Sequence, residues 1–239
     1  MTEYRTLATD IRTLLALDTP AIAVAFLAEQ PAGIPKTSTV SPSACAFWRH
    51  AEQQVFYATA EQHFNCQVGA MVMGFSLPTE ITDQLGGLME SMCAVGYLAP
   101  EEAGKVPAVQ GQPTGIMYGP LTDFPVTPHA ILLWLTARQA MLYNEATGAA
   151  AWTSEAVRVG SRPGCAAIPV AKESGTPALT LGCAGMRTFT EVADDRMLAV
   201  VPGDRLAWFA DRLRATSQAN AEMRSYYQRR KAEVTASQP

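Results

Sequence analysis

The chain has 239 residues, a formal net charge of −4, 48% hydrophobic residues and 17% charged residues, so it can bury a substantial core. Its acidic balance argues against the basic footprint of a nucleic-acid-binding protein. No apolar run approaches the roughly 20 residues that span a bilayer. The N-terminus, MTEYRTLATDIRTLLALD, carries charges throughout and lacks the apolar core of a secretion signal. We therefore expect a cytoplasmic protein that binds neither nucleic acid nor membrane.

Hydrophobic periodicity predicts alternating helices and strands in the first half of the chain. Runs rich in aliphatic, β-branched and aromatic residues are read as strands, and apolar residues at helical spacing are read as helices. In chain order the patterns predict a helix (3–17), two strands (21–27 and 55–60), a helix that begins near Cys66, a second helix (79–99) and a strand (115–121).

The second half shows a similar alternation and ends in a long helix. The patterns predict a buried strand (130–135), a helix (136–147), strand-like runs at CAAIPV (165–170) and ALTLG (178–182), a strand (197–203) and a final helix (204–232). The basic run RSYYQRRK (224–231) lies near the end of that helix. We interpret it as a solvated helix end that complements the helix dipole.

Four of the five cysteines form two similar pairs. Cys45 and Cys66 are 21 residues apart, and Cys165 and Cys183 are 18 residues apart. In each half a buried strand precedes the pair, and the pair brackets a strand-like run. An internal duplication is one source of such a pattern. It predicts repeats over about 18–115 and 116–203, followed by the C-terminal helix.

The fold expected from these patterns is a single domain over residues 1–239, of the α/β or α+β class. It would consist of two halves related by a pseudo-twofold axis, with mixed sheets covered by helices. In that arrangement the two cysteine pairs occupy equivalent positions and face each other, so that four thiolates meet.

Four thiolates are the ligand set of a structural zinc ion or of an iron–sulfur cluster. In a reducing compartment, paired cysteines indicate metal or redox chemistry more often than disulfides. The chain has no CxxC motif, so tertiary structure must gather the ligands. A large core gains little from zinc with such widely spaced ligands, whereas a cluster at the junction would supply chemistry. We therefore expect Cys45, Cys66, Cys165 and Cys183 to bind a [4Fe–4S] cluster, with a redox or sulfur-linked role.

Three further residues are candidates for the surroundings of the cofactor. His63 and Asn65 lie beside Cys66 and can donate hydrogen bonds to it. Arg187 follows Cys183 by four residues and would partly offset the negative charge of the thiolates. Haem is a further cofactor candidate, with His63 as axial ligand, although the CxxCH attachment motif is absent.

Two other functions stay open at this level. The chain can be a small-molecule-binding protein whose cysteines are buried structural residues, or a thiol-dependent enzyme in which His63 activates Cys66. Cys93 is read as a small buried hydrophobe on the helix over 79–99. The sequence leaves open whether the protein is an enzyme, which substrate or redox partner it has, and whether it forms a homo-oligomer.

Several segments together resemble the prokaryotic family called domain of unknown function 169, also described as ArCR-like. They are CAFWRHA, VFYATAEQHFNC, IMYGPL, AILLWL, LGCAGMR and VVPG. The resemblance covers nearly the whole chain and implies one full-length domain. By position, the four paired cysteines and Arg187 match the family's motifs. The family is of uncharacterised proteins, so the resemblance implies no mechanism.

Overall fold

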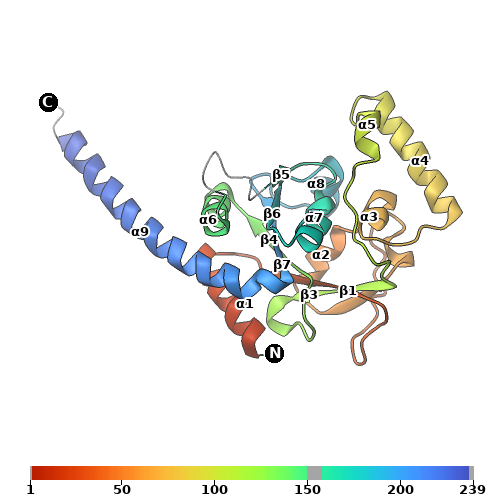
Figure 1. Ribbon diagram of the computed structural model, residues 1–239, viewed down its shortest axis with the longest axis horizontal. Coiled ribbons are helices and arrows are strands. Elements are labelled where there is room, and N and C mark those ends of the chain that lie inside the picture. Colours follow the sequence, from red (N-terminus) through yellow and green to blue (C-terminus); the bar gives the residue numbers. More distant parts are fainter. Residues whose placement is uncertain (1, 150–157, 237–239) are drawn as a thin grey trace.

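The computed structural model describes residues 2–149 and 158–236, and within them a seven-stranded sheet forms the centre of the protein (Figure 1). The strand order is β2-β3-β1-β4-β7-β6-β5. Every neighbouring pair is antiparallel except β5 and β6, which are parallel. The strands are β1 (Ile22–Leu27), β2 (Phe56–Thr59), β3 (Gly115–Pro120), β4 (Ala130–Leu135), β5 (Arg158–Gly160), β6 (Ala178–Thr180) and β7 (Met197–Pro202).

Helices cover both faces of this sheet, which makes the protein an α/β fold. The helices are α1 (Thr2–Leu15), α2 (Ala46–Ala51), α3 (Gln67–Val72), α4 (Thr79–Ala94), α5 (Pro100–Ala103), α6 (Ala137–Thr147), α7 (Ala167–Ser174), α8 (Ala184–Thr190) and α9 (Leu206–Ala236). Single 3₁₀ turns are η1 (Glu61–His63), η2 (Leu121–Asp123), η3 (Gly164–Ala166) and η4 (Gly203–Arg205).

Alternate residues of each strand enter two separate cores. On β1, Ile22 and Val24 join the core under α2 and α7, whereas Ala23 and Ala25 join the core under α1, α6 and α9. Since both faces are covered, the central strands are apolar at every position, as their continuous hydrophobic runs indicate. No described helix is long and apolar enough to cross a membrane.

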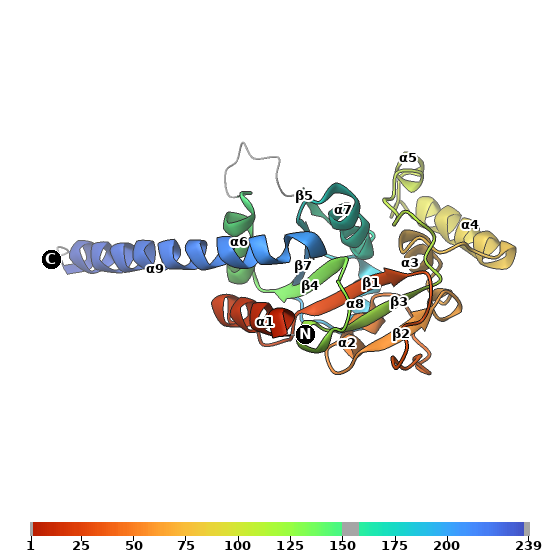
Figure 2. The same ribbon diagram turned by 60° about the horizontal axis from the view of Figure 1, so that its bottom comes forward.

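Two helical segments lie at the margins of the sheet. Helix α4 has no buried residue and stands with α5 at one end of the molecule (Figure 2). Helix α9 runs away from the body at the opposite end, and only its first turns are buried.

One predicted strand is a helix in the structure. Residues 165–170, read as strand-like, instead form η3 and the start of α7. Pro169 is compatible with this helix because it lies in the first turn, where the missing N–H has no helical partner. Gly175, in the left-handed conformation, ends the helix. The other predicted strands are confirmed within a few residues, and β5 was not predicted.

The expected duplication has a counterpart in the strand pairing. On either side of the β1/β4 pair the sheet continues with an antiparallel strand, β3 or β7, and then with β2 or β6. The two parts of the sheet also resemble each other in their helices. The first cysteine of each pair precedes a helix, since Cys45 precedes α2 and Cys165 precedes α7. That the two parts are duplicated halves stays a prediction.

Candidate functional site: four cysteines around one cavity

Each of the four paired cysteines lies at the start of a helical segment. Cys45 precedes α2, Cys66 precedes α3 and Cys183 precedes α8, while Cys165 lies in the η3 turn that leads into α7. The first turn of a helix has N–H groups without helical partners, and these groups favour a nearby negative charge. The chain therefore brings four thiols to the N-terminal ends of four separate helical segments.

Backbone amides at two of these helix starts already point at sulfur. The N–H of Gly69 donates to Sγ of Cys66 at 3.3 Å, and the N–H of Met186 donates to Sγ of Cys183 at 3.4 Å. These two contacts are alike in position as well as length, because each amide lies three residues after its cysteine. Hydrogen bonds of this kind stabilise a thiolate and tune the potential of a bound cluster.

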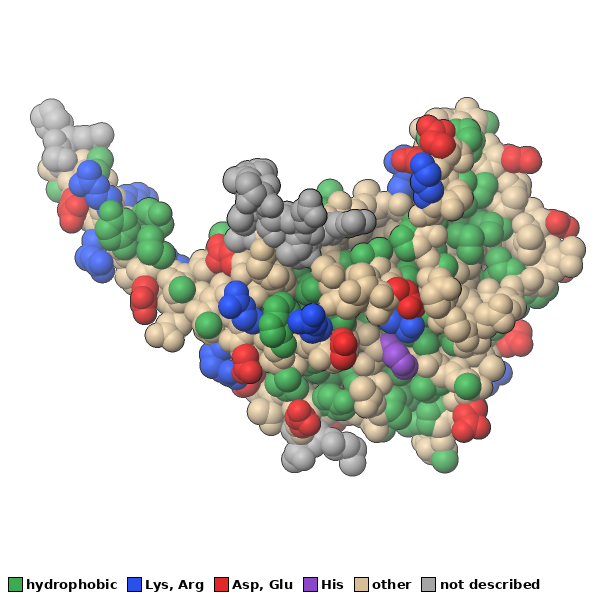
Figure 3. All heavy atoms as spheres, in the orientation of Figure 1, with side chains coloured by type: hydrophobic (Ala, Val, Ile, Leu, Met, Phe, Trp, Pro, Cys, Tyr) green, Lys and Arg blue, Asp and Glu red, His purple; other side chains and the backbone are tan. Residues whose placement is uncertain are grey.

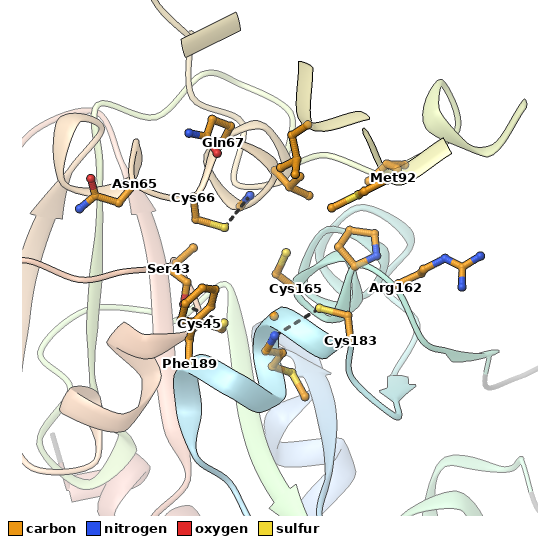
Figure 4. Close-up of a pocket in the computed structure, with 18 of the residues that line it drawn as sticks. Ser43, Cys45, Asn65, Cys66, Gln67, Met92, Arg162, Cys165, Cys183 and Phe189 are labelled. Atoms are coloured by element: carbon orange, nitrogen blue, oxygen red, sulfur yellow. Dashed lines mark hydrogen bonds between the residues drawn. The ribbon is translucent and has the colours of Figure 1, made fainter. Parts of the chain in front are cut away.

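All four cysteines line one cavity of about 330 Å³. In the close-up of Figure 4 their sulfur atoms surround a common space, with Cys66 on one side and Cys183 on the other. Much of the remaining lining is apolar and comes from α4, its following loop and α8: Leu88, Met89, Met92, Leu98, Met186 and Phe189. The four cysteines that the sequence set apart therefore share one cavity, and that their sulfurs bind one centre stays a prediction.

The four thiols do not form a closed single-ion site. A tetrahedral zinc ion with Zn–S bonds of about 2.3 Å holds its sulfurs about 3.8 Å apart. Within the described ranges, no group of three or more His, Cys, Asp or Glu side chains is placed to hold a metal ion. The cysteines instead face a space between them, and a polynuclear group needs more space than one ion does.

Burial keeps the two innermost thiols protonated. Burial raises the pKa of Cys45 to about 12, and the neighbouring Cys66 and Cys183 add to this, although a contact with Ser43 acts in the opposite direction. Burial also raises the pKa of Cys165, with further contributions from the other three cysteines. Four thiolates in this cavity would repel one another, so a cationic centre is needed to hold them together.

Ser43 is a site residue that the sequence did not reveal. Its side chain is buried, and its Oγ lies 3.1 Å from Sγ of Cys45. The same Oγ accepts a hydrogen bond from the N–H of Ala46 at 3.2 Å. Ser43 therefore fixes both the first turn of α2 and the sulfur in front of it. The only sequence signal is a serine two residues before the cysteine.

The small residues around the cysteines are required by close contacts. A Cβ atom at Gly69 would lie 2.8 Å from Cβ of Ala44 and 2.9 Å from Sγ of Cys66. Gly182 has φ +83°, and a Cβ there would lie 2.1 Å from Cε of Met186. Gly69 thus lets two chain segments and a sulfur approach each other closely, whereas Gly182 is favoured by its left-handed backbone conformation.

His63 lies behind the cavity and does not line it. Its Nδ1 is 2.7 Å from the carbonyl oxygen of Thr59, and its Nε2 is 2.9 Å from the hydroxyl of Tyr118. Since a carbonyl can only accept, Nδ1 carries the proton and Nε2 accepts from Tyr118. Burial lowers the pKa of His63 to about 4, so the ring is neutral. Both nitrogens are occupied within the protein, which leaves none for haem or for Cys66.

Tyr118, the partner of this histidine, is itself fully buried. Burial raises its pKa, and negative charge on Cys165 or Cys45 would raise it further. The ring packs on Phe47, with centroids 5.8 Å apart. Tyr118 is a second residue that sequence analysis assigned no role at the site.

The other two candidate residues have structural contacts. Asn65 lines the cavity, but its amide donates to the carbonyl of Ser41 at 2.9 Å and so ties down the segment before Cys45. The guanidinium of Arg187 donates to the carbonyl oxygens of Leu181 and Arg196, at 2.7 Å each, and to those of Ala193 and Asp194. Arg187 therefore holds the segments on both sides of α8 together.

Cys93 differs from its expected environment. The sequence placed it on a buried helical face, but α4 has no buried residue, and Cys93 is half-buried on it. It is not among the residues that line the cavity. The four paired cysteines thus line the cavity, whereas Cys93 lies on α4 outside its lining.

Comparison with known proteins places the chain in a family. The family model described as uncharacterised ArCR, domain of unknown function 169, matches residues 10–211. The uncharacterised protein MJ0308 of Methanocaldococcus jannaschii is 29% identical over 224 residues, covering 85% of this chain and 91% of its own length. No solved structure matches the chain. Since the family model spans most of the sequence, the chain belongs to the uncharacterised ArCR family, domain of unknown function 169.

Proposed function

We propose that Cys45, Cys66, Cys165 and Cys183 bind an iron–sulfur cluster of the [4Fe–4S] type, and that the protein has a redox or sulfur-linked role. The observation that carries the proposal is the shared cavity, in which four thiols from four helical starts face one space. Cysteine thiolates are the usual ligands of such clusters. When bound, the cluster would supply reversible electron transfer.

The residues present fit the needs of this cofactor. The amides of Gly69 and Met186 donate hydrogen bonds to Sγ of Cys66 and of Cys183, and the hydroxyl of Ser43 can donate one to a Cys45 thiolate. The apolar lining from α4 and α8 limits contact with water, which affects the reduction potential. Because four thiolates in one cavity repel one another, the positive charge of the irons would also stabilise their ionised form.

A cluster fits the cavity better than a zinc ion does. The described residues contain no ready tetrahedral group, and binding one zinc ion would require the four segments to move together. In a cluster each cysteine binds a different iron, so the sulfurs stay apart. Zinc is thus the less favoured of the two metal centres. A protein that held zinc would be colourless.

A small-molecule-binding function is the second candidate. The observation in its favour is the apolar part of the cavity, formed by residues of α4 such as Leu88, Met89 and Met92. In that case the cysteines would be packing residues, and an apolar ligand would occupy the space between the helices.

The decisive experiment is purification of the full chain without oxygen, followed by iron, sulfide and zinc analysis and an absorption spectrum. The proposal expects about four irons and four sulfides per chain and a broad absorption band that bleaches on reduction. Cys66→Ala and Cys183→Ala should lose iron, whereas the matched control Cys93→Ala should retain it. A colourless protein with one zinc ion per chain would replace the cluster with a zinc site. A metal-free protein after reconstitution with iron and sulfide would reject both.

A further inference from the structure

Residues 75–108 form a flap that leaves the body of the protein and returns to the same place. The flap contains α4 and α5 and lies between α3 and β3 in the chain. Where it begins and ends, the N–H of Val109 donates to the carbonyl oxygen of Val72 at 2.9 Å. Gly74 has φ +82°, and a Cβ atom there would collide with the carbonyl oxygen of Val109. The two ends of the flap are therefore joined at its base, and a change of backbone angles there would tilt it as a unit.

The flap covers the cysteine cavity but buries little of itself. Its residues that line the cavity are Leu88, Met89, Met92, Tyr97, Leu98 and Val106. From residue 76 to residue 108, however, only Leu98 is buried. Figure 3 shows α4 and α5 at one end of the molecule, with hydrophobic side chains exposed along α4. A segment with so few buried contacts separates from the body at a low cost in free energy.

Arg162, on the segment before Cys165, holds the flap against the body. The carbon of its guanidinium lies 5.0 Å from the centroid of the Tyr97 ring. Its Nη2 donates to Oε2 of Glu102 on α5 at 3.2 Å. The same oxygen accepts from the N–H of Ala99 at 3.0 Å, where α5 begins. Arg162 therefore contacts the flap at two points, the turn after α4 and the helix α5.

Two further hydrogen bonds join the flap to the cysteine segments. The N–H of Ala184 donates to the hydroxyl of Tyr97 at 3.4 Å. Nε2 of Gln67 donates to Oε1 of Gln84 at 2.8 Å. Each of these donors belongs to the residue that directly follows one of the paired cysteines. Together with Arg162, they connect the flap to the segments that carry three of the four paired cysteines.

The contacts that close the flap lie at the surface. The side chains of Arg162 and Glu102 are 40% and 51% exposed. An ion pair so exposed contributes little net free energy, and salt screens it. The contacts are thus weak enough to open while the rest of the fold stays intact.

We propose that the flap is a lid over the cysteine cavity, and that Arg162, Tyr97 and Glu102 form the latch that holds it closed. Opening the latch gives molecules from solution access to Cys66 and Cys183, and closing it keeps water from the site. The lid rests on the proposed function for its purpose, which is control of access to a bound cluster. The motion itself can be measured on thiols that hold no metal.

The test is the rate at which iodoacetamide alkylates each cysteine of the full chain, freed of metal by a chelator and followed by mass spectrometry. Arg162→Gln and Glu102→Gln should each alkylate Cys66 and Cys183 about threefold faster than the wild type, because either change breaks the ion pair. The double variant should be no faster than the faster single variant, since both changes remove one interaction. Higher salt should speed the reaction in the wild type but not in the variants.

Two controls separate the latch from general loosening. Arg5→Gln breaks an exposed ion pair with Asp123 that is remote from the flap in sequence, and it should react like the wild type. Cys93 lies outside the cavity lining, so its rate should be the same in every variant, and circular dichroism should show all of them folded. Unchanged rates at Cys66 and Cys183 in both latch variants would overturn the lid, as would an equal increase at Cys93.

Iron and sulfide analysis of the same preparations before chelation tells a failure of the lid from a failure of the proposed function. Latch-dependent rates in a protein that never binds iron would support the lid and reject the cluster. Latch-independent rates in a protein that binds about four irons would reject the lid and support the cluster.

Discussion

The hydroxyl of Tyr118 lies 2.9 Å from Nε2 of His63, and the two form a buried polar pair beside the cavity. Their geometry determines the histidine tautomer, because the second ring nitrogen meets the carbonyl of Thr59. The pair is neutral, fully hydrogen-bonded and surrounded by Phe47 and Phe75. Its physical consequence is a pH-dependent contribution to stability.

Acidification should destabilise the fold through His63. Burial lowers the pKa of its ring to about 4, whereas an exposed histidine titrates near 6.5. Between these values the unfolded chain binds a proton that the native state excludes. The contribution is fully present above about pH 6.5 and falls by about 3 kcal/mol as the pH drops to about 4. Urea unfolding at a series of pH values measures it.

The variant His63→Gln isolates this effect from that of the carboxylates. It removes the titrating ring, so the difference in unfolding free energy between wild type and variant should shrink as the pH falls from about 6.5 to about 4. A difference that stays constant over this range would mean that His63 has the same pKa in the native and the unfolded state.

Adding one methyl group at Gly69 should disturb the site. The new Cβ would meet Cβ of Ala44 and Sγ of Cys66 at less than 3 Å, so the sulfur or the chain must shift. Gly69→Ala is expected to cost about 1–3 kcal/mol of stability and, if the proposed cluster is bound, to lower the iron content of the purified protein. The control is Gly87→Ala on α4, where no atom lies within 4 Å. That change should stabilise the helix by about 0.5–1 kcal/mol. A Gly69→Ala protein that is as stable as the Gly87→Ala protein would contradict the close contact at Gly69.

Removing the hydroxyl of Ser43 should change the electronic environment of Cys45. The variant Ser43→Ala loses the contact to Sγ of Cys45 at 3.1 Å and the bond from the N–H of Ala46. A stability loss of about 0.5–1.5 kcal/mol is expected from the lost side-chain hydrogen bond, because the N–H of Ala46 keeps its bond to the backbone carbonyl of Ser43 at 3.2 Å. If the cluster is bound, its reduction potential should become more negative, because a hydrogen bond to a ligand sulfur favours the reduced form.

A redox titration followed by absorption measures the effect of Ser43. Ser91→Ala serves as the control, since that hydroxyl donates only to the carbonyl of Gly87 on exposed α4. A potential that is the same in wild type and Ser43→Ala would show that Ser43 does not donate to the ligand sulfur.

Replacing Arg187 with lysine should loosen the segments around Cys183. The guanidinium reaches four carbonyl oxygens, and an ammonium group cannot reproduce this planar set of donors. Arg187→Lys is expected to lose about 2–3 kcal/mol, measured by denaturant unfolding. Arg229→Lys on the exposed part of α9 should leave stability within about 0.5 kcal/mol of the wild type. Similar losses in both variants would refute a specific role of the Arg187 contacts.

The hydrophobic pattern of the sequence was sufficient to predict most helices and strands of the fold. The aliphatic runs over 21–27 and 130–135 are β1 and β4, because continuous apolar sequence suits a strand that is covered on both faces. The run over 165–170 was misread, since a short apolar segment has the same appearance in a buried helix and in a strand. The order of strands in the sheet depends on long-range pairing, which no local pattern encodes.

By itself, the sequence determined that four cysteines in two pairs are set apart from Cys93, because glycines and strand-like runs recur around them. Only the tertiary structure decided that the four share one cavity, that Ser43 and Tyr118 lie beside it, and that His63 and Arg187 are occupied elsewhere. The shared cavity depends on the distance between the segments around Cys45 and Cys66 and those around Cys165 and Cys183, which are about a hundred residues or more apart in the chain. Hydrophobic burial of the sheet faces brings those segments together, and the cysteines meet as a consequence of that packing.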